Sequence, residues 1–138
     1  MKKHIFYIDD DVEDIELISE VANNLGEEIC SFQAVTDLMH LLDNPPPHPA
    51  VVLIDLHLGV IDGAEVVEKI RASPKFTDVP IVMLSNAANP LKVAQSREAG
   101  ANLFMVKPTS MKKISEALQY IIAIDDWSFG PEQFIYSN

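Results

Sequence analysis

The sequence has few of the features that mark secreted, membrane or nucleic-acid-binding proteins. Its 138 residues include one cysteine, Cys30, so no internal disulfide can form, which fits a reducing compartment. Ten lysines and arginines stand against 21 aspartates and glutamates, and the net charge of −11 disfavours binding to phosphate backbones. The first apolar run, 4–8, is too short for a signal peptide or a membrane span. We expect a cytoplasmic protein that binds neither nucleic acid nor membrane.

Short apolar runs alternate with segments of helical period along the whole chain. Most of these runs are almost continuously apolar, which is typical of strands covered on both faces, whereas the second alternates and suits a sheet edge. The predicted strands are 4–8, 29–33, 51–54, 81–85 and 102–106. The predicted helices are 12–25, 36–43, 63–72, 90–99 and 110–123. This alternation, with short connections, predicts parallel strands, right-handed crossovers and one doubly wound α/β domain.

Several local features refine this prediction. The proline tract at 45–47 ends the second helix, and Gly100 is placed to end the helix over 90–99. Cys30 is predicted to be a small core residue. The C-terminal tail, residues 125–138, is aromatic and is expected to fold back on its own domain rather than to form a dimer. Its aromatic residues are Trp127, Phe129, Phe134 and Tyr136.

Polar side chains follow four of the predicted strands at the point where each strand ends. In a doubly wound sheet, functional groups gather beyond the carboxyl ends of the strands, so these side chains are expected to meet at one rim of the sheet. The residues are Asp9, Asp10, Asp11, Asp55, Ser85 and Lys107.

Clustered carboxylates repel one another, and a divalent cation such as Mg²⁺ relieves that repulsion. An aspartate beside such a metal can attack phosphorus and form an acyl phosphate, while a lysine and a hydroxyl hold the oxygens of the transferred group. Simpler explanations suit two other residues. Asp11 is expected to cap the helix over 12–25, and Asp62 to act as a turn or cap residue with Gly63.

In this order and spacing the motifs resemble the receiver domains of two-component response regulators, over about residues 4–123. No single motif is specific, whereas five of them in register are. The motifs are "DD" at 9–10, "DLHLGVIDG" at 55–63, Ser85, "AGA" at 99–101 and "KP" at 107–108.

The resemblance implies a (βα)5 flavodoxin-like three-layer sandwich with the parallel strand order 2-1-3-4-5. It implies that Asp55 is the phosphoacceptor and that Lys107 contacts the phosphoryl group. It also implies a Mg²⁺ site and a pair of switch residues. The metal ligands would be Asp9, Asp10, Asp55 and the backbone carbonyl of His57, and the switch residues would be Ser85 and Phe104.

The sequence departs from the family pattern at a few positions near this site. Gly59 stands where the family usually has proline, which is expected to loosen the loop, and Asn86 replaces a small residue and narrows access to the phosphoryl group. His57 and Ala87 occupy positions that tune the lifetime of the phosphoryl group in the family, and Thr109 replaces a frequent phenylalanine.

The resemblance therefore predicts a single-domain response regulator, with a receiver domain over 1–124, the C-terminal tail and no output domain. It would accept a phosphoryl group from a sensor histidine kinase or a histidine phosphotransfer protein. It would catalyse only its own phosphorylation and dephosphorylation. Phosphorylation would change how the face formed by 90–123 contacts a downstream effector protein. A monomer and a homodimer both remain open.

Three other classes compete with this prediction. A phosphatase of the haloacid dehalogenase type usually has a second aspartate two residues after its nucleophile, where this chain has His57. A flavodoxin-like binding module needs a phosphate-binding loop after the first strand, where this chain has three aspartates. A receiver-like adaptor that is never phosphorylated remains as the alternative, and Asn86 is the residue that favours it.

Overall fold

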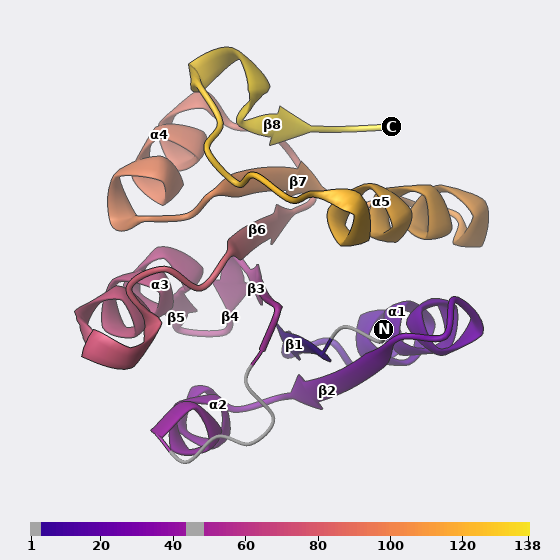
Figure 1. Ribbon diagram of the computed structural model, residues 1–138, viewed down its shortest axis with the longest axis horizontal. Helices are drawn as coiled ribbons and strands as arrows, with labels where there is room; N and C mark the ends of the chain where they lie inside the picture. The colour runs from indigo at the N-terminus through magenta and orange to yellow at the C-terminus, as the bar shows by residue number, and fades with distance from the viewer. Residues whose placement is uncertain (1–3, 44–48) are drawn as a thin grey trace.

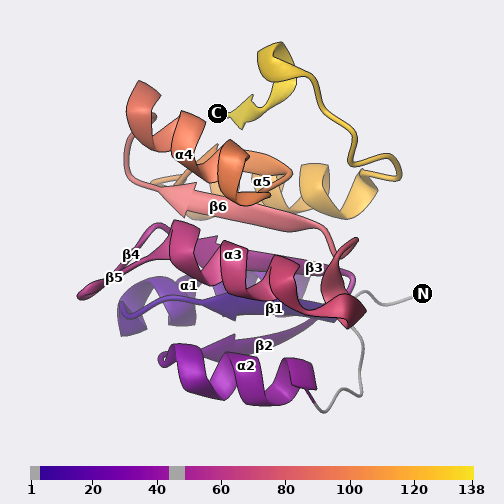
Figure 2. The same ribbon diagram turned by 90° about the vertical axis from the view of Figure 1, so that its left-hand side faces the viewer.

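The computed structural model describes residues 4–43 and 49–138, so the proline tract at 45–47 lies outside the described residues. A parallel sheet forms its centre, in the order β2-β1-β3-β6-β7-β8 (Figures 1 and 2). Its strands are β1 (His4–Ile8), β2 (Glu28–Phe32), β3 (Val51–Asp55), β6 (Ile81–Ser85), β7 (Leu103–Val106) and β8 (Ile135–Tyr136). The first five stand in the order expected of the doubly wound fold, and β8 continues the sheet beyond the predicted edge.

Helices cover both faces of the sheet and complete the expected three-layer sandwich (Figure 1). On one face lie α1 (Val12–Asn24) and α5 (Met111–Ala123), and on the other α2 (Val35–Asp43), α3 (Gly63–Ala72) and α4 (Pro90–Ala99). Consecutive residues of β1 point into the two cores: Tyr7 packs in the α1/α5 core and Phe6 in the opposite one. A strand that is buried on both faces needs apolar residues at successive positions, which explains the continuous apolar runs.

Side-chain and glycine caps set the ends of the helices near the carboxyl ends of the strands. The Asp11 carboxylate accepts hydrogen bonds from the Glu13 and Asp14 amides and starts α1, as predicted. Gly100 ends α4 with φ +116°, a left-handed conformation that costs glycine little. At its other end α4 begins after Asn89, whose side chain accepts hydrogen bonds from the Leu91 and Lys92 amides. Asp11 and Asn89 thus set the first turns of α1 and α4, which follow β1 and β6 in the chain.

A short hairpin that the sequence analysis did not predict follows β3. It consists of β4 (His57–Leu58) and β5 (Ile61–Asp62), which pair antiparallel through a turn at Gly59 and Val60. Gly59 has φ +65°, which proline cannot adopt because its ring fixes φ near −65°. The glycine therefore permits a tight turn that proline could not form, and the loosening of this loop stays a prediction.

The position of Cys30 also differs from the prediction. Its side chain is exposed, although Cys30 lies within a strand. The physical reason is that β2 is an edge strand, which has a neighbouring strand on one side only, and Cys30 borders an open hollow beside β1. The alternation of apolar and polar residues in β2 correctly indicated a sheet edge, but it did not indicate that the Cys30 thiol is exposed.

The C-terminal tail folds back on its own domain, as expected. A 3-10 helix at Pro131–Gln133 leads into β8, which pairs parallel with β7 in the register Phe104–Ile135. Within the described parts of the chain, no helix is both long enough and apolar enough to span a bilayer.

Candidate functional site

Three aspartates converge where β1 and β3 end. The two strands pair in parallel, with Ile8 beside Ile54, so Asp9 and Asp55 follow as neighbours. Carboxylate oxygens of Asp9, Asp10 and Asp55 all lie within 4.8 Å of one another. Asp9 and Asp55 are 0% and 5% exposed, whereas Asp10 faces solvent. The structure thus brings together the three predicted carboxylate ligands at a partly buried site.

Lys107 supplies the positive charge among these carboxylates. Its Nζ donates to Asp9 Oδ2 at 3.0 Å, to Asp55 Oδ2 at 3.1 Å and to Asp14 Oδ2 at 2.8 Å. Its backbone amide donates to the Ser85 carbonyl at 2.8 Å, which fixes the residue against the end of β6. We call Asp9, Asp10, Asp14, Asp55 and Lys107 the acidic rim.

Two residues of this environment were missed by the sequence analysis. Asp14 lies in the first turn of α1, three residues after the Asp11 cap, and this position aims its carboxylate at the rim. Tyr7 lies two residues before Asp9 in the extended chain, so the two side chains are on the same side, and the Tyr7 hydroxyl donates to Asp9 Oδ2. Neither residue belongs to a motif that the resemblance used. For Tyr7 the alternation of side chains along a strand was an available signal, because it puts Tyr7 and Asp9 on the same side.

The carboxylates of the rim differ in their affinity for protons. Burial raises the pKa of Asp55, and the hydrogen bond with Asp9 raises it further, to about 7. Burial alone would also raise the pKa of Asp9, but hydrogen bonds with Asp55, Tyr7, the Asp11 amide and Lys107 lower it. Burial would lower the pKa of Lys107, and its bonds to Asp14 and Asp9 outweigh that effect and raise it. In the metal-free protein, Asp55 therefore holds a proton more readily than Asp9, because its pKa is raised while that of Asp9 is lowered.

The rim has the chemistry of a divalent-cation site. Its four carboxylates outnumber the single ammonium of Lys107, and oxygen donors are the ligands that hard cations such as Mg²⁺ prefer. The β4–β5 hairpin borders the exposed side, where a Cβ atom at Gly59 would lie 3.8 Å from Asp10 Oδ2. The residues present fit a divalent metal ion; the His57 carbonyl as a further ligand stays a prediction.

Backbone contacts hold Asp55 in place. The His57 amide donates to Asp55 Oδ1 at 3.1 Å, and the Gly63 amide donates to the Leu56 carbonyl at 2.7 Å. A Cβ atom on Gly63 would lie 2.4 Å from the Asp55 carbonyl oxygen, so only glycine allows α3 to start this close to β3. Asp62 caps α3 by accepting from the Ala64 amide at 2.9 Å, as predicted.

The two predicted switch residues lie in different surroundings. Ser85 is 4% exposed at the end of β6, and its Oγ accepts a weak 3.4 Å hydrogen bond from the Ala87 amide. Since Leu84 pairs with Asp55, Ser85 lies just beyond the end of β3, beside the rim. Phe104 is fully buried in the core between the sheet and α3 and α4. Their roles in switching stay predictions.

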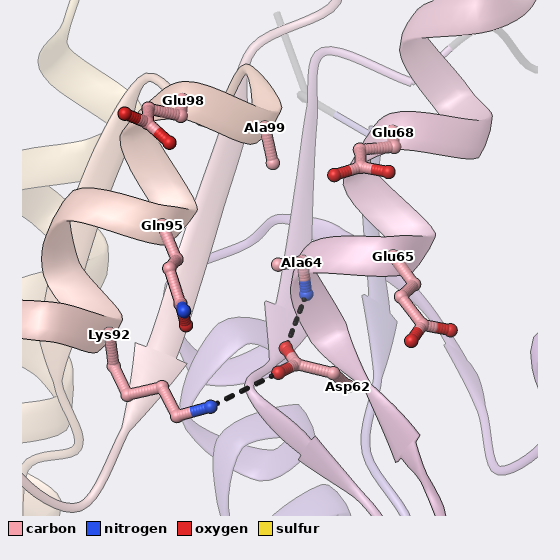
Figure 3. A pocket seen from close by; sticks show the side chains of 8 residues that line it. All are labelled: Asp62, Ala64, Glu65, Glu68, Lys92, Gln95, Glu98 and Ala99. Carbon is pink, nitrogen blue, oxygen red and sulfur yellow. Dashed lines mark hydrogen bonds and ion pairs between the residues drawn. The ribbon is translucent and has the colours of Figure 1, made fainter.

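A hollow of about 480 Å³ lies between α3 and α4 (Figure 3). Carboxylates from both helices line it, and Lys92 Nζ bridges to Asp62 Oδ2 at 3.3 Å across it. Its lining residues are Asp62, Ala64, Glu65, Glu68, Lys92, Gln95, Glu98 and Ala99. It contains none of the residues predicted for phosphoryl transfer, so the predicted chemistry belongs to the rim.

Comparison with known proteins agrees with the geometry. A family model described as the response regulator receiver domain matches residues 5–119. The chain is similar to the chemotaxis protein CheY1 of Helicobacter pylori, with 24% identity over 88% of this chain and 98% of CheY1. It superposes on the Mn²⁺-bound form of response regulator Rcp1 with a TM-score of 0.73 and 27% identity over 86% of this chain and 91% of Rcp1. The curated Rcp1 comes from Synechocystis.

A further solved structure is that of the phosphorylated cyanobacterial phytochrome response regulator RcpA. Its TM-score with this chain is 0.75, at 26% identity over 88% of this chain and 91% of RcpA. A divalent metal and a phosphorylated form are thus recorded for two proteins that share the fold.

Proposed function

The chain belongs to the response regulator receiver domain family, and from this premise we propose that it is a response regulator receiver phosphorylated on Asp55 in the presence of Mg²⁺. The phosphoryl donor would be a sensor histidine kinase or a histidine phosphotransfer protein. The observation that carries the proposal is the buried Asp55 carboxylate, which shares Lys107 with Asp9 beside the exposed Asp10.

The proposed transfer requires an ionised Asp55. One of its carboxylate oxygens attacks phosphorus, a P–O bond forms, and the bond from phosphorus to the donor imidazole nitrogen breaks. The imidazole keeps the electron pair and takes up a proton from solvent. Later a water molecule attacks the phosphorus, and the bond from phosphorus to the Asp55 oxygen breaks. Inorganic phosphate and a proton leave, and the Asp55 carboxylate is regenerated.

The chain's own residues would position the transferred group. Lys107 Nζ, which lies 3.1 Å from Asp55 Oδ2, would donate to the phosphoryl oxygens once the carboxylate is phosphorylated. The Ser85 hydroxyl, at the end of the neighbouring strand β6, would donate to another of these oxygens. Mg²⁺, held by Asp9, Asp10 and Asp55, would supply positive charge that favours the ionised form of Asp55. The protein would turn over no substrate besides its own acyl phosphate.

Intact mass tests this proposal. The protein is incubated with acetyl phosphate, with and without Mg²⁺, and one phosphoryl group is expected on the wild type only when Mg²⁺ is present. Asp55→Asn should gain none. Asp62→Asn is the matched control, because Asp62 caps α3 outside the rim and asparagine caps equally well, so it should be phosphorylated like the wild type.

The competing function is a receiver-like adaptor that docks without phosphorylation. A wild type that gains no mass with acetyl phosphate, and shows no bound beryllofluoride by ¹⁹F NMR with Mg²⁺, would favour the adaptor. An adduct that survives Asp55→Asn would also contradict Asp55 as the acceptor.

A further inference from the structure

The C-terminal tail contacts each element of the face formed by residues 90–123. The Phe104 amide in β7 donates to the Phe134 carbonyl at 2.7 Å. The ring of Phe134 lies under the guanidinium of Arg97 in α4, 5.7 Å from its carbon atom. The ring of Tyr136 stacks on that of Tyr120 in α5, with 4.6 Å between centroids. The tail therefore joins α4, β7 and α5, as Figure 1 shows for the backbone.

One aromatic side chain anchors the tail. Phe134 is 2% exposed and belongs to the same core cluster as Phe104, whereas its neighbour Ile135 is 45% exposed. A last contact, from Asn138 Nδ2 to the Lys113 carbonyl at 2.8 Å, fixes the end of the chain on α5.

The tail also closes a sheet edge. Without β8, β7 would be the edge strand, and the free amide of Phe104 would be open to pairing with another chain. Yet β8 has only two residues, so few backbone bonds hold it. Short elements with few such bonds open at a low free-energy cost compared with the core strands.

We propose that β8 is a displaceable strand that covers β7 until Asp55 is phosphorylated, and that the freed edge then receives an extended, aromatic segment of the downstream partner. This inference rests on the proposed function, because it names the event that the phosphoryl group controls. The tail itself shows the chemistry that the edge accepts: parallel pairing with β7, an aromatic ring against α4 and another against α5.

Geometry links the tail to the rim. Lys107, which pairs with Asp55, follows β7 directly, and its amide bonds to the Ser85 carbonyl. Phe104 lies three residues earlier in the same strand and donates to the tail. Because the tail is fixed to three elements at once, a shift of β7 or α4 relative to α5 breaks one of its contacts. Such a shift therefore weakens docking, and by reciprocity docking opposes phosphorylation.

Hydrogen exchange at the Phe104 amide measures docking directly, because that amide bonds to the tail. The full-length protein is compared with and without beryllofluoride and Mg²⁺, and ¹⁹F NMR establishes that beryllofluoride is bound. We expect the Phe104 amide to exchange at least about fivefold faster in the bound form, the lower end of common coupling factors. Asp55→Asn should show no change.

A fluorescent peptide with the sequence of residues 130–138 tests whether the freed edge accepts a strand. The tethered tail has an effective concentration of about millimolar, so the peptide should bind the resting protein poorly and the beryllofluoride form at least about fivefold more tightly. The Phe134→Ala variant, whose own tail has lost its buried anchor, should bind the peptide even without beryllofluoride. Ile135→Ala, a truncation of the exposed neighbour, is the matched control and should behave like the wild type.

The outcomes separate the two proposals. Bound beryllofluoride with unchanged or slower exchange at Phe104 overturns the displaceable strand and leaves the proposed function standing. Faster exchange without peptide binding overturns the strand-accepting edge. If no beryllofluoride binds, the proposed function fails and this inference fails with it. Should Phe134→Ala not fold, Tyr136→Ala, which removes the stacking on Tyr120 and a half-buried contact with the α1/α5 core, takes its place.

Discussion

The acidic rim and the tail-covered edge of β7 belong to one sheet but are held by opposite kinds of interaction. In the rim, three of the four carboxylates share one ammonium, and Asp55 is protonated more readily than a free aspartate. At the edge, Phe134 and Tyr136 pack against Arg97 and Tyr120. The rim thus has an excess of carboxylates that could hold a divalent cation, whereas the edge of β7 is already paired with the chain's own tail.

This difference predicts that Mg²⁺ compensates for a stabilising residue lost from the rim but not for one lost from the tail. Removing positive charge from the rim leaves carboxylates that repel one another, and an added cation compensates. Removing an aromatic ring from the tail leaves an apolar hollow that no cation fills. The predictions below test this contrast in order of decreasing effect on the free energy of unfolding.

The largest effect is expected from Lys107→Ala. Lys107 is 11% exposed in its side chain and pairs with three carboxylates, so its loss should lower the free energy of unfolding of the metal-free protein by about 3 kcal/mol. Urea denaturation measures this, and Mg²⁺ should recover part of the loss. Lys92→Ala, the matched control at the exposed pair with Asp62, should cost less than about 1 kcal/mol. Equal losses in both variants would contradict a special role for the rim.

Phe134→Ala comes next. Truncating a buried phenylalanine to alanine in a closed core costs about 3–5 kcal/mol of unfolding free energy. Phe134 is buried, but the tail that carries it can undock, so the loss is limited to about 2 kcal/mol. Urea denaturation should show this loss with and without Mg²⁺ alike, and Ile135→Ala should lose less than about 0.5 kcal/mol. If Mg²⁺ reversed the loss of stability in Phe134→Ala, the tail and the rim would not contribute independently to the free energy of unfolding.

The two regions also differ in how far the sequence predicted them. The rim was predicted because topology places the ends of parallel strands at one edge, so Asp9, Asp55 and Lys107 could be joined by type and position alone. The metal ligands and the strand order came instead from the resemblance to receiver domains. Asp14 was missed because it lies on a helix, where the sequence showed only a surface carboxylate.

The tail was only partly predictable. Its aromatic content indicated that it folds back, but two residues, Ile135 and Tyr136, give no periodicity from which a strand can be predicted. The pairing of β8 with β7 depends on tertiary contacts of Phe134 and Tyr136, whose partners lie far from them in the sequence. The hairpin at Gly59 was missed for a similar reason, since each of its strands has two residues.

A pH titration of stability separates the rim from the edge again. Asp55 has a folded pKa of about 7 against 3.8 in the unfolded chain, so the folded state binds more protons between these values. The free energy of unfolding of the metal-free protein should therefore fall, by about 2 kcal/mol, as pH rises from about 5 to 7. Asp55→Asn should lack this fall, and Phe134→Ala should retain it. A fall that persists in Asp55→Asn would assign it to another group.

The smallest effect is expected from Cys30→Ser, which tests the one residue whose burial the sequence misjudged. Within a packed core, replacing the thiol by a hydroxyl would bury an unsatisfied polar group and cost about 1–3 kcal/mol. On the exposed face of the edge strand β2, the hydroxyl stays hydrated, so the free energy of unfolding should change by less than about 0.5 kcal/mol. Thiol titration of the folded protein gives an independent readout, and Cys30 should react without prior unfolding. A large loss of stability, or a thiol that reacts only in urea, would show that β2 is covered in solution. The sheet would then have both of its edges closed, β2 by an unidentified contact and β7 by the tail, instead of the single closed edge that the structure shows.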